Sequence, residues 1–259
     1  MQASDRPSDR RREIVELVRI GGRVQAAELS ARFSVNAETI RRDLSALEAA
    51  GELDRVHGGA VARGTLTVEG RVSSRMAERR EEKLAIARAA AAEIPPFGAI
   101  FIEAGSTTGH LADLLPDRGD LLIVTNALQI ALALTDLGHS TVMTIGGRVR
   151  PASYAEVDTW ALERLAALRF DVAFVGANAV DLAWGLSTMD PAEAAVKAAI
   201  LASAQKSVLL TDHTKFGLRA ACRYGSVKDI DLVVTDPGLD PAAAEEIRAL
   251  GTGIRLAGG

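Results

Sequence analysis

The sequence of 259 residues is long enough for one small and one larger domain, or for a single large α/β unit. Hydrophobic residues make up 48% of it and charged residues 25%, which is the composition of an ordinary globular protein with a sizeable core. The net charge of −4 argues against a wholly basic nucleic-acid coat protein. Cys222 is the single cysteine, which excludes an internal disulfide and a metal cluster built from cysteines.

The sequence gives no indication of a membrane segment or a secretion signal. No apolar run approaches the length of a membrane span, and the N-terminal stretch MQASDRPSDRRRE is too polar for a signal peptide. We therefore expect a cytoplasmic protein. Charge is unevenly distributed: residues 1–64 carry 11 Arg and 10 acidic residues, whereas the remainder carries 19 basic and 24 acidic residues. This asymmetry is mild and identifies no partner by itself.

Residues 1–62 are predicted to form three short helices and a small hairpin. Apolar residues recur at helical spacing on three successive faces. The stretch VHGGAV then places a Gly-Gly turn between short β-prone flanks, which favours a hairpin. The three apolar faces comprise Ile14, Leu17 and Val18, then Leu29 and Phe33, then Ile40, Leu44 and Leu47.

The third helix lies in the stretch NAETIRRDLSALEAAG, residues 36–51, and carries two adjacent arginines. Asn36 is a good N-cap for this helix, and Gly51 suits its C-terminal stop. At helical spacing, Arg42 falls on the face opposite the apolar residues, and Arg41 falls on the flank of that face. The two arginines can form an ordinary solvated face, or they can contact a ligand.

The order of these elements is that of a winged helix-turn-helix, in which the second helix of the motif enters the DNA major groove. Arginines near the start of that helix can contact phosphates or form bidentate hydrogen bonds with guanine. The wing RVHGGAV adds an arginine and a histidine that can reach the DNA backbone or the minor groove. The candidate DNA-binding residues are Asn36, Glu38, Thr39, Arg41, Arg42, Ser45, Arg55 and His57.

The stretch ELSARFSVNAETIRRDLSALEAAGELDRVHGGAV, residues 28–61, resembles the N-terminal domain of the DeoR family of bacterial transcription regulators. The paired arginines before Asp-Leu, followed by a Gly and the Arg-Val-His-Gly-Gly-Ala wing, make the combination specific. Asn36 stands where the family often has Ser, and both residue types cap helices. The resemblance implies a transcription regulator whose partner is double-stranded operator DNA.

From Arg63 to Glu82 the chain is polar and charge-rich, which indicates a linker that runs into a helix. Residues 83–259 then alternate short apolar runs with helical stretches. This alternation predicts an α/β domain with a mostly parallel sheet covered on both faces. The expected strands are 99–102, 121–125, 141–145, 172–176, 207–211 and 231–235, and the expected helices are 126–137, 159–168, 190–204 and 240–250.

Polar loops follow several of these strands. The stretch FIEAGSTTGHLADLL places small residues between a strand and a helix, where backbone N–H groups form a natural anion pocket and hydroxyl groups add donors. Such a turn can also be a purely structural cap. Other strands are followed by TNA, GGRVR, GLSTMDPAEAAVK and TDHTKFG. Because α/β sheets bind ligands at the carboxyl ends of their strands, we expect a ligand site at this edge.

These segments resemble, in order, the sensor domain of the DeoR family, which is related in fold to ribose-5-phosphate isomerases and binds phosphorylated sugars. The resemblance implies that residues 105–108 hold the phosphate and that Asp212 lies near the sugar hydroxyls. It also places two lysines in the pocket. The effector-binding residues that it indicates are Glu103, Gly105, Ser106, Thr107, Thr108, Asn126, Gly147, Arg148, Gly185, Lys197, Asp212 and Lys215.

Some of these residues also have a purely structural interpretation. Lys197 can be an ordinary surface lysine, and Arg148 and Arg150 can be solvated loop charges. Three positions depart from the family's pattern, which bears on the identity of the sugar more than on the phosphate. Glu103 stands where the family usually has Asp, Ala127 replaces a common Ser, and His213 stands within the Asp-x-x-Lys turn.

The alternative function is that of a sugar-phosphate isomerase, or a related enzyme, with an added DNA-binding head. Proton transfer between adjacent sugar carbons needs a carboxylate base, and Glu103, Asp190 and Asp212 lie near the expected pocket. The sequence contains no paired-carboxylate loop or nucleophile constellation. A third possibility, a nucleotide-dependent kinase, would need a Gly-rich loop ending in Lys-Ser/Thr, and the sequence lacks one. We therefore predict no catalytic residue, no metal and no cofactor.

The sequence thus predicts a repressor of carbohydrate metabolism genes that a phosphorylated sugar releases from its operator. One winged helix offers only a small contact surface, so two copies bound to repeated half-sites are expected. The expected assembly is a homodimer or a homotetramer whose subunits meet through the larger domain.

Overall fold

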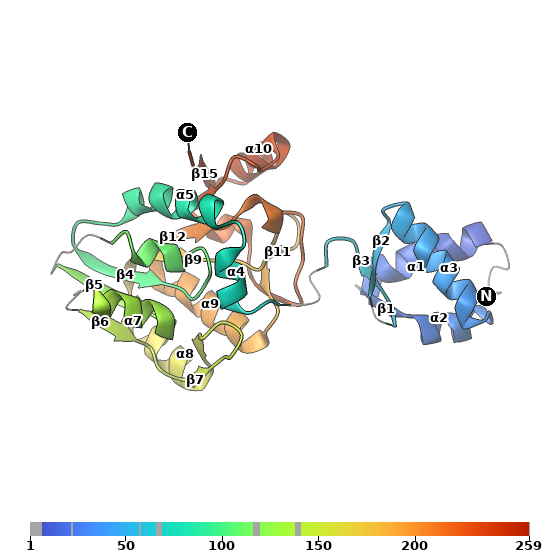
Figure 1. Ribbon diagram of the computed structural model, residues 1–259, viewed down its shortest axis with the longest axis horizontal. Helices are drawn as coiled ribbons and strands as arrows, with labels where there is room; N and C mark the ends of the chain where they lie inside the picture. The colour runs from blue at the N-terminus through green and yellow to red at the C-terminus, as the bar shows by residue number, and fades with distance from the viewer. Residues whose placement is uncertain are drawn as a thin grey trace. The chain divides into compact units, whose positions relative to one another are not determined.

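The computed structural model describes residues 7–21, 23–56, 58–65, 69–115, 120–137 and 141–258. The chain divides into two compact units, Met1–Thr65 and Leu66–Gly259. Both units are drawn in Figure 1.

The first unit is a winged helix-turn-helix, as the sequence predicts. Three helices, α1 (Pro7–Gly21), α2 (Ala26–Phe33) and α3 (Ala37–Ala49), accompany three short strands. The strands β1 (Arg23–Gln25), β2 (Leu53–Val56) and β3 (Gly59–Ala62) form an antiparallel sheet in the order β1-β3-β2, and β2 and β3 form the wing.

The apolar faces predicted from the sequence form the core of this unit. Ile14 and Ile40 are fully buried, and Leu44 is 2% exposed. The predicted cap of α3 is confirmed, because the Asn36 side chain accepts a hydrogen bond from the Thr39 backbone N–H over 2.8 Å. Helix α3 is therefore fixed both by burial of its apolar face and by its N-cap.

The second unit contains a parallel sheet of seven strands, in the order β15-β14-β12-β9-β4-β5-β6. The six predicted strands are present, and the sequence analysis missed the seventh, β15. The strands are β4 (Gly98–Ile102), β5 (Leu121–Thr125), β6 (Val142–Thr144), β9 (Phe170–Val175), β12 (Ala204–Leu210), β14 (Leu232–Thr235) and β15 (Gly253–Leu256).

Helices cover both faces of this sheet (Figure 1). Helix α5 lies on one side, and α8 and α9 lie together on the other. The buried side chains of β4, β9 and β12, including Phe101, Phe174 and Leu209, form the centre of the core between these layers. The helices are α5 (Arg80–Ala90), α6 (Gly109–Ala112), α7 (Leu128–Asp136), α8 (Thr159–Ala166), α9 (Pro191–Ser203) and α10 (Pro241–Ala249).

The chain order reverses direction in the sheet at β4. Strands β5 and β6 continue the sheet on one side of β4, whereas β9, β12, β14 and β15 lie on the other. The loops after β4 and β9 therefore leave in opposite directions and open a crevice at the carboxyl ends of these strands. In open α/β sheets this topological switch point is where ligands bind.

Smaller elements lie outside the main sheet. The strands β10 (Ala179–Asp181), β11 (Gly185–Thr188) and β13 (Cys222–Gly225) form an antiparallel sheet, and β7 (Arg148–Val149) pairs with β8 (Glu156–Val157). Residues 69–82, which the sequence analysis assigns to a linker, lie within the second unit and include α4 (Val72–Ala77). Val72 is buried, and its N–H donates to the Ala152 carbonyl over 2.8 Å.

Candidate functional site

Helix α3 presents two exposed arginines on the side away from the core. The Arg41 side chain is 68% exposed and the Arg42 side chain 78% exposed. Both lie near Glu38, at 3.4 Å and 3.6 Å, as expected for neighbours one turn apart on a helix. Ion pairs this exposed contribute little to stability, so both guanidinium groups are free to exchange Glu38 for another anion.

The wing is joined to α3 by side-chain hydrogen bonds. Arg55 Nη1 donates to Ser45 Oγ over 2.9 Å, and the Arg55 backbone N–H donates to Glu48 over 3.3 Å. The arginines of the helix and the arginine of the wing therefore belong to one rigid surface. His57, the remaining wing residue predicted to contact DNA, lies outside the described residues.

A buried ionic cluster that the sequence analysis missed supports this surface from beneath. Asp43 is 2% exposed, and its carboxylate accepts hydrogen bonds from Arg10 over 2.6 Å and from Arg11 over 2.7 Å. Asp43 is buried on the inner side of α3, whereas its neighbour Arg42 is exposed. The cluster holds α1 against α3 and fixes the rotation of the helix that carries the exposed arginines.

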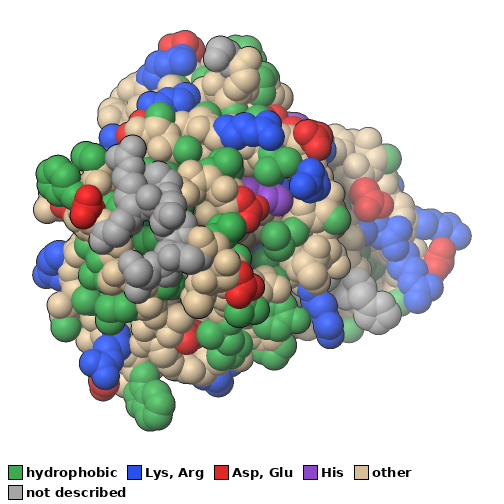
Figure 2. All heavy atoms as spheres, turned by 60° about the vertical axis from the view of Figure 1, so that its left-hand side comes forward, with side chains coloured by type: hydrophobic (Ala, Val, Ile, Leu, Met, Phe, Trp, Pro, Cys, Tyr) green, Lys and Arg blue, Asp and Glu red, His purple; other side chains and the backbone are tan. Residues whose placement is uncertain are grey.

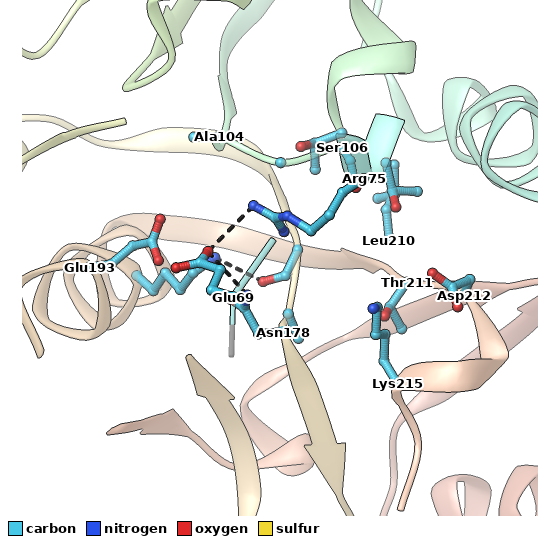
Figure 3. Close-up of a pocket in the computed structure, with 16 residues that line it drawn as sticks. Glu69, Arg75, Ala104, Ser106, Asn178, Glu193, Leu210, Thr211, Asp212 and Lys215 are labelled. Carbon is cyan, nitrogen blue, oxygen red and sulfur yellow. Dashed lines mark hydrogen bonds and ion pairs between the residues drawn. The ribbon is translucent and has the colours of Figure 1, made fainter. Parts of the chain in front are cut away.

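In the second unit, a pocket opens at the topological switch point. Its empty volume is about 430 Å³, open mouth included, which lies in the range of small-molecule sites. The loops after β4, β9 and β12 line it, together with residues from α9 and from the segment that precedes α5 (Figure 3). The lining residues are Glu69, Arg75, Ala104, Gly105, Ser106, Thr107, Thr108, Gly176, Ala177, Asn178, Glu193, Lys197, Leu210, Thr211, Asp212 and Lys215.

The loop of residues 105–108 offers unused hydrogen-bond donors to this pocket. Its backbone N–H groups donate to no acceptor among the described residues. The Thr108 and Thr211 hydroxyls are buried without a partner in the described part of the chain. Buried polar groups are normally hydrogen-bonded, so a pocket lined by several unused ones is suited to a polar ligand.

The two lysines of the pocket differ in their partners. Lys197 Nζ donates to Glu103 over 2.6 Å and to the Gly176 carbonyl over 3.0 Å, and it lies 5.3 Å from the centre of the Tyr224 ring. By contrast, no hydrogen bond or ion pair joins the Lys215 ammonium to another described residue. Lys215 is therefore the pocket cation that is available to a ligand, and Lys197 is held in place by the protein.

Comparisons with known proteins cover both units. A family model for the DeoR-like helix-turn-helix domain matches residues 10–65, and a model for the DeoR C terminal sensor domain matches residues 78–237. The chain belongs to the DeoR family.

Relatives are similar to this DeoR-family protein over nearly their whole length. It is 35% identical to the HTH-type transcriptional regulator GlpR of Haloferax volcanii, covering 96% of this chain and 97% of that protein. It is 34% identical to the glycerol-3-phosphate regulon repressor of Escherichia coli, covering 88% and 90%. It is 30% identical to the HTH-type transcriptional regulator GolR of Listeria innocua, covering 97% and 99%.

As a member of this family, the protein is a DNA-binding transcription regulator. Among solved structures, ribose 5-phosphate isomerase A from Neisseria gonorrhoeae is 18% identical with a TM-score of 0.38, covering 53% of each chain. No helix in the described ranges is long and apolar enough to cross a bilayer. Within the same ranges, no group of three or more His, Cys, Asp or Glu side chains is placed to hold a metal ion.

The pocket of this DeoR-family regulator brings together seven of the twelve predicted effector residues. Two others lie directly behind it. Glu103 is fully buried and accepts hydrogen bonds from Lys197 Nζ and, over 2.9 Å, from the Gly176 N–H. Asn126 accepts a hydrogen bond from the Ala104 N–H over 2.8 Å. Both shape the loops of the pocket without lining it. The seven that line it are Gly105, Ser106, Thr107, Thr108, Lys197, Asp212 and Lys215.

The other three predicted residues lie away from the pocket. Arg148 pairs with Asp158 over 2.6 Å beside a separate hollow that Gly147 also lines. Gly147 and Gly185 have positive φ angles of 120° and 110°, and a Cβ at either position would lie 2.3 Å from a carbonyl oxygen of a paired strand. These glycines therefore permit close backbone approach, which accounts for them without a ligand.

Four further pocket residues, Glu69, Arg75, Asn178 and Glu193, were not predicted from the sequence. Asn178 comes shortly after a predicted strand, so the strand-end rule could have found it. Glu69 and Arg75 lie in a polar stretch whose composition is that of a linker, and no local signal distinguishes them. Residues distant in sequence hold Glu69 in the pocket, because it accepts hydrogen bonds from Arg150 over 2.9 Å and from Asn178 over 3.2 Å. Arg75 in turn donates to Glu69 over 3.3 Å.

Proposed function

We propose that this DeoR-family protein is a repressor that binds its operator through α3 and the wing and that a phosphorylated sugar releases it. The observation that carries the proposal is the pocket at the switch point, whose lining residues include N–H groups, hydroxyls and the Lys215 ammonium that have no partner among the described residues. Because the same chain carries a DNA-binding domain, binding of a small metabolite in this pocket can regulate DNA binding.

For the DNA contact, Arg41 and Arg42 supply the charge that a major-groove helix needs. Asn36 and Thr39 lie at the helix start, where backbone N–H groups attract phosphate. Ser45 and Arg55, joined across helix and wing, extend the same surface. We therefore assign base or phosphate contacts to all of these residues and to Glu38, and a wing contact to His57.

For the effector, the phosphate belongs at the loop of residues 105–108. Its N–H groups and hydroxyls can surround the phosphate oxygens, and Lys215 adds a positive charge. The sugar hydroxyls then face the carboxylates of Asp212 and Glu193, which accept hydrogen bonds well. Glu103 and Asn126 support this arrangement from behind the loops.

The enzyme alternative is less favoured, because two of the three candidate bases, Glu103 and Asp190, are committed to structural contacts, and one oxygen of the third, Asp212, is hydrogen-bonded within its own turn. Glu103 is fully buried against Lys197, and burial raises its pKa despite that partner. Asp190 caps α9 and pairs with Arg150 over 3.2 Å. Asp212 accepts hydrogen bonds from the Thr214 N–H and hydroxyl. Family membership and these contacts together support a regulator rather than an isomerase.

The proposed assembly is a dimer, or a pair of dimers, formed through the edge of the main sheet at β6. Helix α7 and β6 carry a group of exposed apolar side chains there, and Figure 2 turns this side of the second unit towards the viewer and shows hydrophobic side chains spread over it. Exposed apolar groups at a sheet edge are suited to contact with a second copy. We call this group the α7/β6 patch; it comprises Leu128, Leu132, Leu137 and Met143, which are between 40% and 64% exposed.

The effector assignment is tested by thermal shift. The full-length protein is heated with glycerol 3-phosphate, ribose 5-phosphate, fructose 1-phosphate and galactosamine 6-phosphate, each beside its unphosphorylated counterpart and inorganic phosphate. We expect at least one phosphorylated compound to raise the melting temperature where its counterpart does not, and Thr107→Val to reduce that shift. Equal shifts with and without the phosphate group, or an undiminished shift in the variant, would contradict the assignment.

A further inference from the structure

Glu69 places a carboxylate inside the pocket. Its side chain is 7% exposed and accepts hydrogen bonds from Arg150, Asn178 and Arg75, the last over 3.3 Å. Figure 3 shows it across the pocket from the loop that carries Ser106, with Arg75 between the two. Glu69 is four residues from Thr65, the last residue of the DNA-binding unit. An acidic side chain next to the connection between the units therefore occupies part of the candidate sensor site.

The partners of Glu69 differ in how much they depend on it. Arg150 also pairs with Glu193 over 3.0 Å and with Asp190 over 3.2 Å. Burial opposes its charge, but the hydrogen bond to Glu69 and the charges of Glu193, Glu69 and Asp190 hold its pKa above the ordinary value. Arg75 has no other acidic partner in the described part of the chain. If Glu69 leaves, Arg150 keeps two carboxylates, whereas Arg75, which lines the pocket, keeps no carboxylate among the described residues and only the Gly70 carbonyl, 3.0 Å from its Nε.

The charges of the pocket disfavour an anionic ligand while Glu69 is in place. Three acidic and three basic side chains are among the described residues that line it, so their charges cancel while Glu69 is in place. A phosphate added to that arrangement meets a nearby carboxylate of the same sign, with Arg75 already engaged. Removal of Glu69 leaves a net positive lining. The six side chains are Glu69, Glu193, Asp212, Arg75, Lys197 and Lys215.

We propose that Glu69 is an internal occupant of an anion subsite centred on Arg75, and that an anionic effector binds by displacing its carboxylate from that guanidinium. The inference rests on the proposed function, because the displacing group is the phosphate of the sugar effector. It also supplies a route of regulation. While Glu69 is held, the chain that leads from the DNA-binding unit is fastened to the pocket, and when the effector takes Arg75, that fastening is lost.

The competition is measured by calorimetric titration of inorganic phosphate into the full-length protein, its Glu69→Gln variant and a matched control, Glu81→Gln. The Glu81 side chain is 83% exposed on α5, and its one ion pair among the described residues is with Arg80, at 3.6 Å. Since Gln keeps the size of the side chain but not its charge, we expect phosphate to bind Glu69→Gln about tenfold more tightly than wild type or control. Equal or weaker binding to Glu69→Gln than to wild type would overturn the inference.

A second experiment measures whether Glu69 anchors the segment that leads from the DNA-binding unit to the pocket. A nitroxide label is attached at Thr65→Cys in a Cys222→Ser background, and its electron paramagnetic resonance spectrum is recorded with and without phosphate. We expect phosphate to increase the mobility of the label in the wild-type pocket, and Glu69→Gln to increase it without phosphate. An unchanged spectrum in Glu69→Gln would overturn the inference. Absence of phosphate binding in all three proteins would instead contradict the proposed phosphate site, and the Glu69→Gln spectrum would still decide the role of Glu69.

Discussion

The guanidinium of Arg55, on the wing strand β2, donates a hydrogen bond to the hydroxyl of Ser45, on α3, over 2.9 Å. The two residues are ten positions apart, and this contact makes helix and wing a single surface. A surface of fixed shape can meet DNA without the entropic cost of ordering two separate elements.

Replacing Arg42 by Ala should reduce operator affinity by about 1–3 kcal/mol and relax sequence preference, because the exposed guanidinium is placed to read a base. Arg41→Ala should weaken binding to every sequence and lower its salt dependence, as expected for a phosphate contact. Both are measured by fluorescence anisotropy at several salt concentrations. Arg248→Ala, an exposed helix arginine in the second unit, is the control. Wild-type affinity in both α3 variants would show that α3 is not the recognition helix.

Asp43→Ala should destabilise the DNA-binding unit by about 3 kcal/mol, because it leaves the buried Arg10 without its carboxylate. Calorimetric unfolding of the full chain measures this as a lowered transition for that unit. Glu48→Ala, at an exposed position on the same helix, should cost under about 1 kcal/mol. Equal lowering of the transition of the DNA-binding unit in Asp43→Ala and Glu48→Ala would contradict a stabilising role of the buried cluster.

Leu132→Glu should break the subunit contact if the α7/β6 patch forms it, since Leu132 is 64% exposed and a charge there opposes burial. The expected result in multi-angle light scattering is a dimer or larger species for wild type and a smaller species for the variant. Leu256→Glu, on β15 at the opposite edge of the sheet, should keep the wild-type mass. A monomeric wild-type protein, free and on DNA, would refute the proposed assembly.

Glu93→Gln should lower stability near neutral pH by about 1 kcal/mol, an effect that fades in acid. Burial raises the pKa of Glu93, but hydrogen bonds from Lys206 and Arg255 outweigh it and hold that pKa below its ordinary value of 4.5. A depressed folded-state pKa stabilises the protein above the ordinary pKa, and this contribution is lost as pH falls through the folded value. Urea unfolding from about pH 6 to about pH 3.5 should show the two proteins converging; a constant difference would contradict the prediction.

Much of the fold could be predicted from local signals. The N-cap at Asn36, the apolar face of α3 and the six apolar strand runs all act over a few residues, so the sequence displays them directly. Strand β15 was missed because its residues, GIRL, are half-exposed at the sheet edge and form no continuous apolar run. Edge strands lack the two-sided burial that makes central parallel strands recognisable.

The site could be predicted only in part, because strand ends do not all meet at one point. Residues that follow β4 and β12 line the pocket, since those strands lie beside the switch point. Arg148 follows β6, the outermost strand, and so lies too far from the switch point at β4 to reach the pocket. Glu69 could not be predicted, because its burial depends on Arg150, 81 positions further along the chain.

We propose that a sugar phosphate bound in the pocket releases this regulator from DNA. It is tested most directly by fluorescence anisotropy on DNA that the full-length protein has selected from a random-sequence pool, titrated with the sugar phosphate that gives the largest thermal shift. We predict that operator affinity of the wild-type protein falls roughly 5–150-fold. Thr107→Val and Lys215→Ala should bind the same DNA normally yet remain bound at that concentration. Unchanged wild-type affinity at saturating sugar phosphate, or release of both variants at wild-type concentrations, would contradict the claim.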